Sequence, residues 1–215
     1  MSAPNEHCAS LPPPAPLELL EADELLALGL RASAAGDAAS ALSFFKLALA
    51  RHPGHAHAHW MLGAEYAALQ LPDRAHQHLA RAVELDPALP VARFQLGLLR
   101  LTRGEVEGAE QTWLGLDERP ADDPLRRFGR GLLLLVRGRP AEAQLELRAA
   151  ADDPATDPAL RRDLKAVLGR IAGGEASVSG AAPPDPETVR DGPSPAEASI
   201  GSHLALSAYA GGVRP

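Results

Sequence analysis

The sequence has a single cysteine and no long apolar run. Cys8 is the only cysteine among the 215 residues, so the chain cannot form an internal disulfide. The longest apolar stretch is GLLLLV at 131–136, which is far shorter than the ~18 residues typical of a membrane-spanning helix. The N-terminus also lacks the basic start and apolar run of a secretory signal. We therefore expect a cytoplasmic protein without a membrane span.

Aromatic residues and positive charge are scarce as well. Phe, Trp and Tyr make up 4% of the chain, while Ala, Leu and Arg are abundant, and this composition favours helices over sheets. The net charge is −7 and the pI is about 5.6, whereas nucleic-acid-binding domains are usually basic. These features predict an all-α protein that does not bind nucleic acid.

A regular repeat runs through most of the chain. Glycine and alanine each recur four times at the same constant interval, at Gly29, Gly63, Gly97 and Gly131 and at Ala41, Ala75, Ala109 and Ala143. A fixed period of about 20–50 residues is typical of a solenoid. We place four units of equal length at 22–55, 56–89, 90–123 and 124–157, each with two short helices. A small residue on each helix would let the two helices of a unit cross closely.

The repeat resembles a known family. Its period, its Gly and Ala positions, Tyr66 and the proline near the end of each unit are similar to the tetratricopeptide repeat, most closely in WMLGAEYAALQLPDRAHQHLARAVELDP. The resemblance covers residues 22–157 and implies a right-handed α-solenoid of about four helix-turn-helix units. One departure is clear, because the fourth position of the repeat, usually tryptophan in the family, is occupied by Leu25, His59, Arg93 and Arg127.

The segments around the repeats differ in composition. Residues 158–172 have apolar residues at helical spacing, and a solenoid needs such a helix to cap its last apolar surface. We therefore expect a domain over 17–172 that ends in this capping helix. Residues 1–16 and the tail 173–215 are rich in Pro, Gly, Ser and Ala and are expected to be disordered. Within the tail, 199–210 carry a short apolar motif of Ile200, Leu204, Leu206 and Tyr209.

The resemblance also implies a concave groove lined by the first helix of each unit. Carried over to this sequence, the family's groove positions are mostly apolar, and an exposed apolar surface of this extent normally marks a binding site. The expected groove residues are Leu26, Leu30, His57, Trp60, Met61, Ala64, Val91, Phe94, Gln95, Leu98, Leu101 and Phe128.

Two interpretations of the aromatic groove residues stay open. Trp60, Phe94 and Phe128 would be strong anchors for an amphipathic helix, or they would pack between units as core residues. Some family members clamp an acidic C-terminus with Lys, Arg and Asn on this face. Here the corresponding places are apolar or uncharged, so a heat-shock co-chaperone role is not expected; they hold Leu26, Leu30, Met61, Val91 and Gln95.

Catalytic, cofactor and metal motifs are not evident, so we expect neither enzyme activity nor a cofactor. His55 and His59 have a metal-ligand spacing, but no Cys or carboxylate joins them locally, and His76 and His78 point in different directions on one helix. We therefore predict no metal site. The fourth unit is rich in arginine, which forms either a solvated face or a patch for an acidic partner: Arg126, Arg127, Arg130, Arg137 and Arg139.

The expected function is a non-catalytic adaptor or scaffold that binds a protein or peptide with an apolar helical segment. The motif at 199–210 would dock into the groove in cis or onto a second copy of the chain, so self-association stays open. The alternative is a chaperone for a secreted protein. Type III secretion translocator chaperones are similar to this chain in being small, acidic tetratricopeptide proteins with apolar grooves, although this chain has an extra repeat and a long tail.

Overall fold

The computed structural model describes residues 17–173, and the segments outside this range include the apolar motif at 199–210. The described part contains nine α-helices, a 3-10 turn at Leu17–Leu19 and no strand, so the prediction of an all-α protein is confirmed. None of these helices is both long and apolar enough to cross a bilayer. The helices are α1 (Ala22–Ala34), α2 (Ala38–Arg51), α3 (Ala56–Ala68), α4 (Pro72–Leu85), α5 (Pro90–Thr102), α6 (Val106–Leu114), α7 (Pro124–Val136), α8 (Pro140–Asp152) and α9 (Pro158–Ala172).

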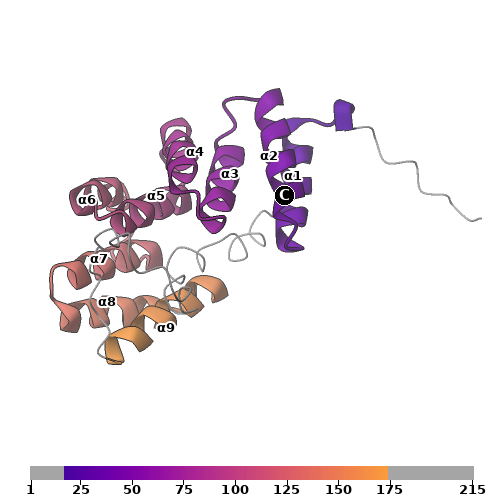
Figure 1. Ribbon diagram of the computed structural model, residues 1–215. Coiled ribbons are helices and arrows are strands. Elements are labelled where there is room, and N and C mark those ends of the chain that lie inside the picture. The colour runs from indigo at the N-terminus through magenta and orange to yellow at the C-terminus, as the bar shows by residue number, and fades with distance from the viewer. Residues whose placement is uncertain (1–16, 174–215) are drawn as a thin grey trace, which may run out of the picture.

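The helices pack in adjacent pairs along a curved row (Figure 1). The first helices of the pairs, here called the A helices, are α1, α3, α5 and α7, and they begin at residues 22, 56, 90 and 124. The B helices α2, α4, α6 and α8 begin at 38, 72, 106 and 140. Both series start at the interval set by the repeat glycines and alanines, which is consistent with a helical repeat. The last helix, α9, spans the expected range 158–172 and packs on α8.

Each pair is joined by the same close contact between its two helices. The repeat glycine of the A helix faces a large apolar side chain that occupies the same position on every B helix. A Cβ on Gly63 would lie 2.8 Å from Leu79 Cγ, and one on Gly131 would lie 2.7 Å from Leu147 Cδ2. The four repeat alanines of the B helices are fully buried. Small residues therefore permit the crossing, and the four side chains that fill the space over the glycines are Phe45, Leu79, Trp113 and Leu147.

The turns inside the pairs need a left-handed backbone at one position. Gly36, Gly104 and Gly138 have φ angles of 78°, 76° and 70°. In the second pair the equivalent residue is Gln70, with φ 57°. A residue with a Cβ is disfavoured in this conformation, so Gln70 is a strained exception in an otherwise regular turn.

Replacing the glycine at the tightest crossing should weaken the fold. Gly97→Ala places a methyl group against the Trp113 ring, which is held by its N–H bond to the Phe94 carbonyl at 3.0 Å. Overpacking of this kind costs about 1–3 kcal/mol. The control is Gly169→Ala in α9, because a Cβ there meets no atom within 4 Å. We expect the control to stabilise by about 0.5–1 kcal/mol, as measured by urea unfolding. A stable Gly97→Ala variant would contradict the close-contact account.

Relieving the strained turn should strengthen the fold. Gln70→Gly removes the Cβ from a residue at φ 57°, and we expect the free energy of unfolding to rise by about 1 kcal/mol. The converse change, Gly104→Ala at φ 76°, should lower it by a similar amount. Urea unfolding curves measured side by side test both expectations, and the same sign of change in both variants would show that the turn conformation is not the cause.

Candidate functional site

The candidate site is the surface that α3 and α5 form together, here called the A-helix face. It consists of Trp60, Met61, Ala64, Gln95, Leu98 and Leu101, all predicted as groove residues. The Trp60 indole N–H donates to Gln95 Oε1 at 2.8 Å, and both side chains are buried. This hydrogen bond connects neighbouring A helices, so the second and third units share one surface.

The A-helix face is apolar and largely closed to solvent. Met61, Ala64, Leu98 and Leu101 are between 3% and 6% exposed. The principal helix contacts join partners within a pair, consecutive helices and successive A helices. Leu98 and Leu101 belong to the buried apolar cluster that includes Leu132 of α7, and Met61 and Ala64 belong to the cluster that includes Leu79 of α4. The side chains of this face are therefore apolar, as in many binding surfaces, and as little exposed to solvent as the side chains of a protein core.

The other predicted groove residues divide into two groups. Leu26, Leu30, His57 and Val91 are partly exposed, and all but His57 pack against the buried cluster that contains Trp60 and Met61. The His57 ring meets the Trp60 ring edge-on, with centroids 6.0 Å apart. Phe94 and Phe128 form the second group, and they belong to the interior of the protein.

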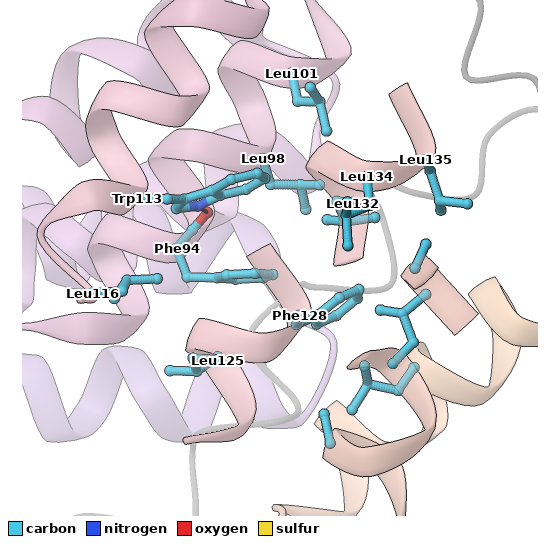
Figure 2. Packing of buried hydrophobic residues seen from close by; sticks show 14 of the residues in the cluster. Phe94, Leu98, Leu101, Trp113, Leu116, Leu125, Phe128, Leu132, Leu134 and Leu135 are labelled. Carbon is cyan, nitrogen blue, oxygen red and sulfur yellow. Dashed lines mark hydrogen bonds between the residues drawn. The ribbon is translucent and has the colours of Figure 1, made fainter. Parts of the chain in front are cut away.

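Phe94 and Phe128 are buried, as the packing interpretation expects, and their role as groove anchors stays a prediction. They are 1% and 2% exposed, with ring centroids 5.0 Å apart, and Phe94 also stacks on Trp113 at 5.7 Å (Figure 2). The reason is the bulk of Trp113, which fills the space over both Gly97 and Gly129. The aromatic stack joins the third and fourth units, as the second interpretation proposed.

His59 and Arg93, at the fourth position of the second and third units, bond to the loop that precedes their helix. His59 Nε2 bonds to the Pro53 carbonyl at 3.1 Å, and Arg93 Nη2 donates to the Pro87 carbonyl at 2.9 Å. In both cases the acceptor is the proline that closes the preceding unit. A donor at this position therefore connects consecutive units by a hydrogen bond.

The histidine cluster contributes to packing and capping. His55 is the N-cap of α3, where its Nδ1 accepts from the Ala58 backbone N–H at 3.3 Å. This leaves its Nε2–H to donate to Asp23 Oδ1 at 2.9 Å, which ties α3 to α1. Among residues 17–173 no three His, Cys, Asp or Glu side chains gather in a way that could hold a metal ion.

His59 and His78 form a direct pair that the sequence did not predict. Their Nδ1 atoms are 3.0 Å apart. Because His59 Nε2 faces a carbonyl and must carry the hydrogen, its Nδ1 accepts and His78 Nδ1 donates. His78 also stacks on Tyr66 at 5.6 Å. Burial, followed by the charges of His59 and Lys46, lowers the pKa of His78 to about 4, and burial also lowers the pKa of His59.

Glu65 is a further residue that sequence reasoning missed. Its side chain on α3 is only 4% exposed. Burial raises its pKa, while a hydrogen bond from Ser33 on α1 opposes that rise. The carboxyl group thus lies between the first two units, and no local sequence signal marks it, because its partner belongs to a helix of the preceding unit.

The histidine pair should make the protein less stable in mild acid. The folded-state pKa of His78 is about 4 against an ordinary value of 6.5, so stability is full above pH 6.5. As the pH falls from 6.5 towards 4, the unfolded chain takes up a proton that the folded chain does not. We expect His78→Phe to reduce this loss by about 1 kcal/mol, since solvent screens a half-buried group.

Urea unfolding between pH 7.5 and 4.5 measures the effect. His52→Phe is the matched control, because His52 is exposed and lies outside the pair. Parallel pH profiles for wild type and His78→Phe would contradict the account of the pair.

Comparison with known proteins adds no family assignment. No protein-family model matches the chain, and no curated protein does so either. The arguments about function therefore depend on the residues and contacts described above.

Proposed function

We propose that this protein is a non-catalytic interaction module of the tetratricopeptide type, which binds an apolar peptide or amphipathic helix on its A-helix face. In this proposal the four helix pairs form a right-handed solenoid capped by α9. The observation that carries the proposal is the apolar character of the face, where Met61, Ala64, Leu98 and Leu101 come from successive A helices.

The chemistry of the face fits an apolar helical ligand. Four apolar side chains surround a single polar pair, Trp60 and Gln95, whose hydrogen bond is internal to the face. A helix with anchors spaced at i, i+3/i+4 and i+7 is the usual ligand of such a surface. Trp60 is the aromatic residue of this surface and is the expected centre of the binding energy.

The same proposal includes regulation by the chain's own tail. The motif at 199–210 is apolar, and about 27 residues separate it from the end of α9 at Ala172. A flexible linker of that length would span roughly 25–30 Å, and the proposal takes this as the reach of the motif. The tail would then compete with any external apolar ligand, and its release would expose Trp60 and its neighbours.

A labelled, leucine-rich amphipathic helical peptide tests both parts of the proposal. We expect the chain ending at residue 196 to bind this probe at least several-fold more tightly than the full chain, as measured by fluorescence anisotropy. Trp60→Ala in the shortened chain should weaken binding about tenfold or more. The matched control is Leu145→Ala on α8, because Leu145 is 71% exposed and lies away from the A-helix face.

The two parts fail in different ways. Equal affinities of the full and shortened chains would exclude competition by the tail, whatever the effect of Trp60→Ala. Equal effects of Trp60→Ala and Leu145→Ala would exclude the A-helix face as the binding surface. Circular dichroism and thermal unfolding of each variant separate loss of binding from loss of fold.

A further inference from the structure

A pocket of about 330 Å³ lies between α6 and α7, away from the A-helix face. Its walls are one side of α6 with the turn that follows it and one side of α7. The helix α6 has nine residues, whereas the other B helices have 13 or 14. It ends at Leu114, and the turn that follows contributes Asp117 to the pocket lining. The volume falls within the usual range for ligand-binding pockets.

Two ion pairs mark the ends of this α6–α7 pocket. Arg137 Nη2 bonds to Glu110 Oε2 at 2.6 Å, and Arg126 Nε bonds to Asp117 Oδ1 at 3.0 Å. Between them lies Arg130, on the same stripe of α7, since spacings of four and seven positions repeat one helical face. The two ion pairs thus connect the walls of the pocket at its ends, and Arg130 lines the pocket between them.

Four arginines and two carboxylates line the pocket, although the whole chain carries −7. Each lining arginine has a carboxylate partner, and two of these partners lie outside the lining: Glu146 beside Arg130 and Glu142 beside Arg139. Arg130 has a side chain that is 70% exposed, and its Nε lies 3.4 Å from Glu146 Oε1. A guanidinium has five N–H donors, and one ion pair uses only one or two of them. Donors therefore remain for a ligand that brings its own carboxylates.

The floor between the arginines is apolar. Trp113, Leu114 and Leu133 contribute to the lining, and Leu114 is 51% exposed. A purely ionic ligand would leave this surface in water. A ligand with an apolar side chain between acidic groups would cover it and meet the guanidinium groups on both sides.

We infer that the α6–α7 pocket is a second binding site, which takes an acidic peptide segment with an apolar side chain between its carboxylates. The arginine stripe from 126 to 137 extends over about 16 Å of helix. This length corresponds to roughly four or five residues of an extended peptide. The site is independent of the A-helix face, so the protein would hold two different segments of one partner or two partners at once.

The test uses the full-length chain and two fluorescein-labelled pentapeptides, Glu-Leu-Asp-Leu-Glu and its amide counterpart Gln-Leu-Asn-Leu-Gln. We expect the acidic peptide to bind, with an affinity that falls as salt rises, and the amide peptide to bind at least tenfold more weakly. Arg130→Gln should weaken binding of the acidic peptide at least fivefold. The matched control, Arg148→Gln, changes an exposed arginine of α8 that does not line the pocket, and it should have no effect.

Several outcomes would overturn the inference. They are no measurable binding of the acidic peptide, equal binding of both peptides, or equal effects of Arg130→Gln and Arg148→Gln. Because the Arg130 side chain is mostly exposed, its replacement should leave the fold intact, and thermal unfolding checks this. Trp60→Ala should leave binding of the acidic peptide unchanged, so this site and the A-helix face can fail separately.

Discussion

The contact between a glycine on each A helix and a bulky apolar side chain on its B helix is the constraint on which the structure depends. It recurs in all four pairs, at equivalent positions of the repeat. A Cβ on the A helix would occupy the same space as the side chain of the B helix, so the crossing is possible only with glycine. The fully buried alanines of the B helices bring the second backbone equally close, and each pair becomes a close-packed unit that can stack on the next.

The identity of the bulky side chain then decides how neighbouring pairs meet. In the third pair it is Trp113, which is larger than Leu79 or Leu147 and extends beyond its own glycine to Gly129 of the next pair. Its ring stacks on Phe94, and Phe94 contacts Phe128. Trp113, Phe94 and Phe128 therefore pack together at the junction between the third and fourth pairs. The apolar surface proposed for binding is correspondingly confined to residues of α3 and α5, with Trp60 as its aromatic member.

Polar groups are placed at the junctions, where each has a specific partner. His59 and Arg93 bond to the carbonyls of Pro53 and Pro87, and His55 connects α3 to Asp23 on α1. Burial lowers the pKa of both His59 and His78, so protonation of either ring is less favourable in the folded protein than in the unfolded chain. The second unit and its link to Pro53 thus respond to pH, whereas the aromatic junction between the last two units does not depend on titrating groups.

The sequence by itself determined the all-α class, the period and the small residues at the crossings, because these depend on composition and on local spacing within a short segment. The starts of equivalent helices recur at the interval that the sequence repeat predicts.

Only the tertiary structure decided which apolar side chains are interior and which polar side chains meet. Phe94, Phe128 and Trp60 occupy equivalent repeat positions and are all buried, Phe94 and Phe128 in the aromatic stack with Trp113 and Trp60 beside Gln95. His59 and His78 meet although they belong to different helices. Arg126, Arg130 and Arg137 line one pocket with Glu110 and Asp117, which come from α6 and the turn after it. Such contacts depend on how two helices are placed relative to each other, and a one-dimensional pattern does not contain that information.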